Sequence, residues 1–120
     1  MRIPKHKFDS EALEDFDEVF FLQNRTNFLN WVQDYNWPIA KDICALLRAY
    51  TKTLESDLIE ILRSNYEEWV CTIIGAVLYY ADYPSERITS VIKELYNSDE
   101  QTDYVKEYCM DFFDNFGIEY

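Results

Sequence analysis

The stretch QDYNWPIA, residues 33–40, interrupts an otherwise helical pattern and decides how the chain turns. Pro38 fits the first position of a helix, where its missing N–H group leaves no hydrogen bond unmade. Proline also disfavours the α conformation at the preceding residue, so Trp37 is expected at the N-cap position. Asn36 tolerates a left-handed backbone and can end the helix before it. The stretch therefore predicts the corner of a tight helical hairpin with the Trp37 ring over its open end. The alternative is a recognition hot spot at Trp37.

Apolar residues recur at helical spacing on both sides of this corner. Asp9 or Ser10 is expected to cap the first helix and Thr53 the fourth, while Gly117 is a natural stop for the last. The fifth helix is apolar almost all round, which is typical of a central helix packed on several sides. Seven helices are expected, over residues 12–20, 28–35, 39–50, 54–62, 66–80, 88–95 and 104–116.

A weak internal repeat appears when the sequence is shifted by thirty residues. The apolar positions of residues 28–32 then fall on those of 58–62, and residues 39–47 fall on 69–77. The same shift carries 58–62 onto 88–92. Each unit is a helix, a short corner and a second helix, and stacked units of this kind share a core with their neighbours. We therefore expect an all-α fold: a HEAT-like α-solenoid stack of about three helix pairs in a single compact domain, residues 1–120.

The tryptophan-rich corner also resembles the signature of a small bacterial protein family of unknown function. That signature reads Trp-x-x-Asp-x-Asn-Trp-Pro-x-Ala, followed some thirty residues later by an acidic-Trp start to the next helix. The matching residues here are Trp31, Asp34, Asn36, Trp37, Pro38 and Ala40, then Glu67, Glu68 and Trp69. The resemblance implies a compact HEAT-like helical fold, and it implies no reaction.

The composition is strongly acidic. The chain carries 23 acidic and 11 basic residues, a net charge of −12, which repels nucleic-acid backbones and anionic membrane surfaces. Three widely separated cysteines and the lack of an apolar leader favour a cytoplasmic protein with reduced thiols. No apolar run is long enough to cross a bilayer.

Residues that could carry chemistry are few. His6 is the only histidine and lies in a charged leader, so no catalytic triad and no histidine-ligated metal site is expected. Cys44, Cys71 and Cys109 fall on predicted buried faces, where thiols are unreactive. Two glycines cannot build a phosphate-binding loop. The sequence thus indicates no catalytic residues, no cofactor and no metal.

The net charge is concentrated at the two ends of the chain. Segments 9–18 and 99–120 hold thirteen of the acids and one base, which leaves ten acids and ten bases elsewhere. These ends are a solvated surface, a docking surface for a basic protein or, least favoured, a carboxylate metal site. If they dock a partner, tyrosines beside the acids would be its anchors. The candidate partner-binding residues are Glu11, Glu14, Asp15, Glu18, Asp103, Tyr104, Glu107, Tyr108, Asp111 and Asp114.

These features favour a non-enzymatic binding protein. Its most specific form is a cytoplasmic immunity-type inhibitor of a basic toxin domain such as a nuclease. The second hypothesis is a helical adaptor or scaffold domain that binds a partner through a groove rather than through charge. An enzyme or metalloprotein is the third, and metal analysis of the purified protein would distinguish it.

Overall fold

Helices follow one another along the whole chain, and no strand occurs. The computed structural model describes residues 1–120, and the all-α prediction is confirmed. The α-helices are α1 (Glu18–Gln23), α2 (Arg25–Asn30), α3 (Pro38–Leu47), α4 (Glu55–Leu62), α5 (Glu67–Thr72), α6 (Glu86–Asn97) and α7 (Asp103–Phe116). Tighter or wider helical turns are η1 (Ser10–Leu13), η2 (Arg48–Tyr50), η3 (Ile73–Val77) and η4 (Leu78–Tyr80). None of the helices combines the length and the apolar composition needed to cross a bilayer.

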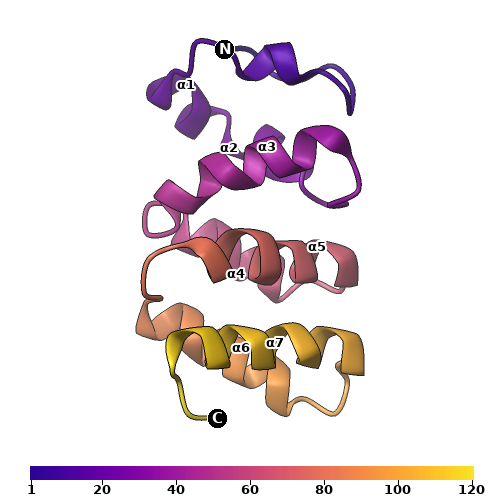
Figure 1. Ribbon diagram of the computed structural model, residues 1–120, viewed down its shortest axis with the longest axis vertical. Helices are drawn as coiled ribbons and strands as arrows, with labels where there is room; N and C mark the ends of the chain where they lie inside the picture. Colours follow the sequence, from indigo (N-terminus) through magenta and orange to yellow (C-terminus); the bar gives the residue numbers. More distant parts are fainter.

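The helices are arranged in layers along an axis of 40 Å, with 23 and 21 Å across it (Figure 1). Helix α3, the segment from α5 to η4, and α7 lie one below another on the near side. The π-helical turn η3 contacts both α3 and α7, and α4 contacts α6 behind them. One cluster of 29 buried apolar side chains draws on all seven α-helices, so the chain forms a single globule.

The corner at residues 36–38 forms as predicted, with one correction. Trp37 is extended, with φ −67° and ψ 126°, and Pro38 begins α3. The Trp37 ring is half-buried against the core and meets the Trp31 ring edge-on at 5.8 Å. The left-handed conformation expected of Asn36 is wrong, because α2 has already ended at Asn30. The Asp34 carboxylate instead accepts a hydrogen bond from the Asn36 N–H at 2.8 Å, and this side-chain turn redirects the chain.

The helix predicted over residues 12–20 is also wrong. The helical turn η1 ends at Leu13, and Asp15 then adopts a positive φ of 53° before α1 begins. Asp9 does not cap a helix, since its buried carboxylate accepts two hydrogen bonds from the Arg2 guanidinium, at 2.5 and 2.9 Å. The Arg2 hydrogen bonds lower the pKa of Asp9 to about 2. The α1 cap is Asp17, which accepts from the Phe20 N–H.

Of the remaining helix boundaries, those of α6 and α7 follow local signals, whereas the start of α4 does not. Gly117 ends α7, as predicted, in the left-handed conformation at φ 65°, and Thr102 caps the start of this helix. Thr53 does not cap α4, because that helix begins at Glu55 with Leu54 at its N-cap and no capping side chain. Ser85 caps α6 and also donates to the carboxylate of Glu55, which joins α4 to α6.

All three cysteines are buried and unpaired, as predicted, and burial raises each thiol pKa to about 12.

Candidate functional site

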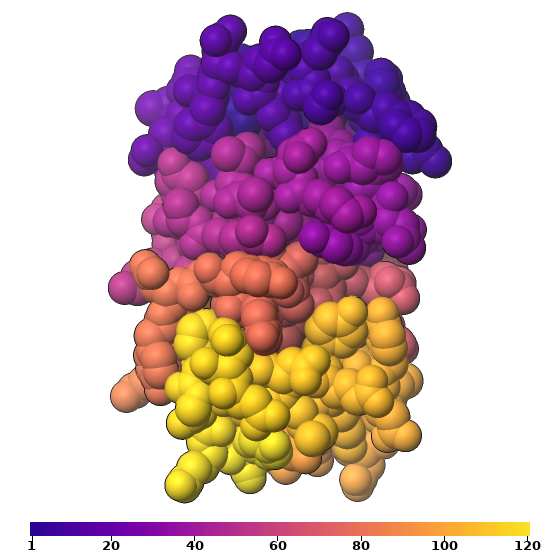
Figure 2. All heavy atoms as spheres, in the orientation of Figure 1, coloured from indigo at the N-terminus to yellow at the C-terminus, as the bar shows by residue number.

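The fold places the two acidic segments at opposite ends of the molecule. Figure 2 shows the N-terminal residues at one end of the long axis and α7 at the other, with the remaining layers between them. One group of candidate residues lies in η1, α1 and the link between them: Glu11, Glu14, Asp15 and Glu18. The other lies on α7: Asp103, Tyr104, Glu107, Tyr108, Asp111 and Asp114. The structure therefore does not join them into one surface.

The α7 residues adjoin a concave site, which the N-terminal acids do not. A cavity of about 260 Å³ lies between the α2–α3 corner, the α5 to η4 segment and α7. A second cavity of about 220 Å³ continues it and shares Gly75, Tyr80 and Tyr108. We name the two cavities together the tyrosine groove. Its lining is Tyr35, Asn36, Glu68, Cys71, Thr72, Gly75, Ala76, Tyr79, Tyr80, Tyr104, Tyr108 and Asp111.

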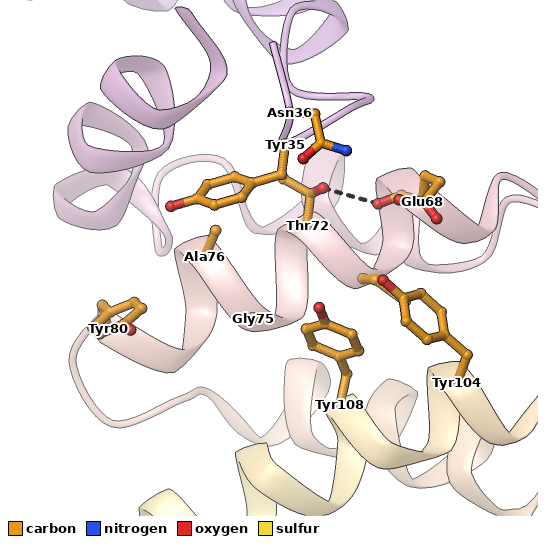
Figure 3. Close-up of a pocket in the computed structure, with 10 residues that line it drawn as sticks. Tyr35, Asn36, Glu68, Thr72, Gly75, Ala76, Tyr80, Tyr104 and Tyr108 are labelled. Carbon is orange, nitrogen blue, oxygen red and sulfur yellow. Dashed lines mark hydrogen bonds between the residues drawn. The ribbon is translucent and has the colours of Figure 1, made fainter. Parts of the chain in front are cut away.

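Tyrosines surround a floor of small residues in this groove. Figure 3 shows Tyr35 on one side of the α5 to η4 segment and Tyr104 and Tyr108 on the other, with the hydroxyls of the two α7 tyrosines directed toward that segment. The two α7 rings pack edge-on with centroids 5.4 Å apart. Large rigid rings beside a small-residue floor give a partner both apolar contact and hydroxyl hydrogen bonds.

Gly75 makes this arrangement possible. It lies inside the π-helical turn η3, and a Cβ atom there would come within 2.7 Å of the Tyr108 Cδ1 atom and closer still to Cε1. The Tyr108 ring therefore lies directly on the backbone of η3. Single π turns inside helices recur at functional sites. Because Gly75 has no side chain, Tyr108 of α7 can pack against η3 and line the groove.

Arg48 fixes the far wall of the groove. Its Nε donates to the Ala76 carbonyl at 2.9 Å, so a carbonyl of η3 accepts a hydrogen bond from a residue of η2. Its guanidinium lies 4.4 Å from the centroid of the Tyr80 ring. These contacts hold Tyr80 at the end of the groove through a cation–π interaction.

The groove offers neutral hydroxyls and unpaired carboxylates. The interaction with Tyr108 raises the pKa of the Tyr104 hydroxyl, and partial burial adds to it, so Tyr104 remains a hydrogen-bond donor at neutral pH. Glu68 and Asp111 make no ion pair, since the four ion pairs of the protein lie elsewhere. The buried thiol of Cys71, with its raised pKa, is not a nucleophile at neutral pH.

The fold places few residues where they could serve catalysis or bind a metal ion. His6 is exposed, and its Nδ1 accepts a hydrogen bond from the Phe8 N–H at 3.2 Å. No group of three or more histidine, cysteine, aspartate or glutamate side chains is placed to hold a metal ion.

Sequence reasoning identified Tyr104, Tyr108 and Asp111 but missed the other walls of the groove. Tyr35 was expected inside a helix, yet it lies exposed in the corner, with the Lys41 ammonium 4.8 Å from its ring centroid. The one available signal was Gly75, the only glycine within an expected helix. Which ring would cover that glycine depended on helix packing.

The fold and the groove define a class: a small all-helical protein with a tyrosine-lined groove between the α2–α3 corner, the α5 to η4 segment and α7. The chain belongs to the family described as Domain of unknown function (DUF5071), whose sequence model matches residues 2–111. The resemblance to an uncharacterised family is thereby confirmed at the level of the family. No curated protein matches the chain.

Proposed function

We propose that this chain is a non-enzymatic protein-binding module that receives a basic partner in the tyrosine groove and on the adjoining face of α7. The observation that carries the proposal is the position of Tyr108 and Asp111. Both were candidate partner-binding residues, and both line a cavity to which the η3–η4 segment also contributes. Tyrosines in concave surfaces often carry most of the binding free energy of an interface.

The charge around the groove favours a basic partner. Glu68 and Asp111 line it without an ion pair, and α7 carries a single base, Lys106, among its acids. An acidic field of this kind accelerates encounter with a basic protein, and salt screens it. The N-terminal acids lie at the other end of the molecule, so we place the primary contact on α7.

The most specific form of the proposal is a cytoplasmic, immunity-type inhibitor of a basic toxin domain such as a nuclease. Small size, helical form and clustered acid support this role. We interpret the layered helix pairs as a HEAT-like stack in which the second helices form the binding face. We also interpret the Trp-x-x-Asp-x-Asn-Trp-Pro-x-Ala pattern as the structural corner of a bacterial family, because its tryptophans pack on one another rather than in the groove.

A helical adaptor or scaffold domain is the alternative. It is favoured by the aromatic and small residues of the groove, where Tyr35, Tyr80 and Gly75 offer contact area without charge. An adaptor of this kind would bind through shape and hydroxyl contacts, so its affinity would change little with salt.

The test begins with affinity capture from the native host, followed by mass spectrometry to identify the partner. Association kinetics are then measured at low and physiological salt for the wild type and for the double variant Glu107→Lys, Asp111→Lys. We expect a basic partner, a steep fall of the association rate with salt, and a loss of affinity of about tenfold or more in the variant.

The matched control is Asp42→Lys, Glu86→Lys, because both residues are exposed and outside the groove and neither forms an ion pair. Reversing Glu55 would be a poor control, since its carboxylate accepts hydrogen bonds from Ser85 and Arg87. Equal losses in the two double variants would contradict docking through α7. Salt-independent binding that is weakened by Tyr108→Ala would favour the adaptor.

A further inference from the structure

A separate cavity of about 250 Å³ lies between α2, α4 and the start of α5. Its walls include Asn30, Asp57, Glu60, Tyr66 and Trp69, and it shares no residue with the tyrosine groove. Cavities that hold drug-sized ligands usually measure about 300–1,000 Å³, so this one has the size for a single side chain or a small ion.

The cavity is negatively charged and contains no lysine or arginine in its lining. Glu60 is exposed and makes no ion pair. Asp57 is partly buried, and its Oδ2 accepts a hydrogen bond from the Arg25 Nε at 3.2 Å. The fold thus already holds one guanidinium against Asp57 and leaves the second carboxylate, Glu60, free to bind another.

An aromatic pair forms the wall beside these carboxylates. The Tyr66 and Trp69 rings lie 6.1 Å apart and are tilted by 57°. Tyr66 is 66% exposed, so its ring is available to a ligand, whereas Trp69 packs partly against the core. The exposed Tyr66 ring therefore offers a cationic group an aromatic face beside the carboxylates.

We propose that this cavity binds the guanidinium group of an arginine side chain presented by another molecule. A guanidinium is planar, stacks on aromatic faces and donates paired hydrogen bonds to carboxylates, and the cavity offers both kinds of surface. In this site Tyr66 and Trp69 contact the faces of the group, and Glu60 accepts its N–H donors. The proposal is independent of the tyrosine groove and stands or falls separately from the proposed function.

The experiment is a titration of the ¹⁵N-labelled full chain with acetyl-arginine amide, followed by NMR. The chain has three tryptophans, so each indole N–H gives its own signal and that of Trp69 reports on this cavity. Acetyl-norleucine amide, which has no charge, is the control ligand. We expect a saturable shift of the Trp69 signal with the arginine compound alone, while the signals of the other two tryptophans stay in place.

Two variants with matched controls locate the site. Tyr66→Leu and Glu60→Gln should each weaken binding about twofold to fivefold, the range for one exposed cation–π contact or one exposed ion pair. Tyr83→Leu removes a ring that is also 66% exposed but lies outside the cavity, and Glu100→Gln removes an exposed carboxylate elsewhere. Both controls should bind as the wild type does. Because all four residues are exposed, the fold should survive, and circular dichroism checks this.

Several results would overturn the proposal. A Trp69 signal that stays fixed at a large excess of the arginine compound, or that shifts equally with the norleucine compound, would contradict arginine binding. Unchanged binding in both site variants would place the ligand elsewhere. Tighter binding of tetramethylammonium than of the arginine compound would assign the cavity to quaternary ammonium ions instead. Variants of the tyrosine groove, such as Tyr108→Ala, should leave this titration unchanged, which separates its outcome from that of the proposed function.

Discussion

The two acidic ends of the chain have similar compositions and different structures. In the N-terminal segment the acids lie on short turns around Asp15, and one of them, Asp9, is buried against Arg2. At the other end the acids lie along a continuous helix, α7, whose apolar side is buried in the core and whose tyrosines enter the groove. Charge content alone therefore does not define a surface. What distinguishes the two ends is that the α7 charges lie along one continuous helix beside a groove, whereas the N-terminal charges lie on short helical turns.

The largest difference between the two ends should appear in their contributions to stability. Phe112 of α7 is fully buried, whereas Phe16 of the N-terminal segment is 42% exposed. Phe112→Ala should lower the free energy of unfolding by about 3–5 kcal/mol, the usual result of emptying a buried aromatic site. Phe16→Ala should cost about 1 kcal/mol or less. Urea unfolding measures both, and equal losses would show that the N-terminal segment is as tightly packed as α7.

A smaller effect is expected where α7 meets η3. Gly75→Ala places a methyl group against the Tyr108 ring and should destabilise the protein by about 1–3 kcal/mol, as overpacking does. Tyr108→Ala removes the obstructing ring, so the double variant should lose less than the sum of the two single losses. A thermodynamic cycle from urea unfolding gives this coupling. Additive losses would mean that the contact with the Tyr108 ring is not what makes Gly75→Ala destabilising.

The two left-handed residues offer a finer comparison. Gly117 ends α7 at φ 65°, and Gly117→Ala should cost about 1 kcal/mol, because a Cβ atom strains this conformation. Asp15 adopts φ 53° in the N-terminal segment. Asp15→Gly relieves the backbone strain at this residue but raises the conformational entropy of the unfolded chain. The net change in the free energy of unfolding should therefore stay within about 0.5 kcal/mol. Thermal unfolding of both variants tests the pair, and a large loss in Asp15→Gly would reveal a role for that carboxylate in the fold.

The smallest effect concerns the Arg2–Asp9 pair and its dependence on pH. The folded-state pKa of Asp9, about 2, lies below its ordinary value of 3.8. Its contribution to stability is therefore fully present above pH 3.8 and is lost as the pH falls toward 2. Asp9→Asn should be less stable than the wild type at neutral pH, and the difference should shrink over this acidic window. Urea unfolding between neutral pH and pH 2 measures it, and a constant difference would contradict the lowered pKa.

Much of the fold could be predicted because its signals are local. Pro38 begins a helix and Gly117 ends one as expected, since backbone sterics at these residues act without tertiary contacts. Two of the wrong local predictions, those for Asn36 and Asp9, have a direct physical reason. Asn36 and Asp9 were given backbone roles on the basis of residue type. In the fold the Asp34 carboxylate accepts a hydrogen bond from the Asn36 N–H and so forms the turn, and the Asp9 carboxylate accepts hydrogen bonds from Arg2.

The candidate site could be predicted only on α7. Tyr104, Tyr108 and Asp111 share one face of a helix, and helical spacing reveals that face. Their partners across the groove come from other segments, such as Tyr35 and Tyr80. No sequence period relates these residues to α7, so their meeting could not be read from spacing.

The sequence by itself determined the all-helical class, the corner at Trp37–Pro38, the burial of the cysteines and the acidic charge of both ends. These properties follow from periodicity and composition, which each segment carries independently of the others. Only the tertiary structure decided that the two acidic ends lie apart and that the Tyr108 ring covers Gly75 to form a groove. That outcome depends on how helices distant in sequence pack, because close packing selects one arrangement among many with the same helical pattern.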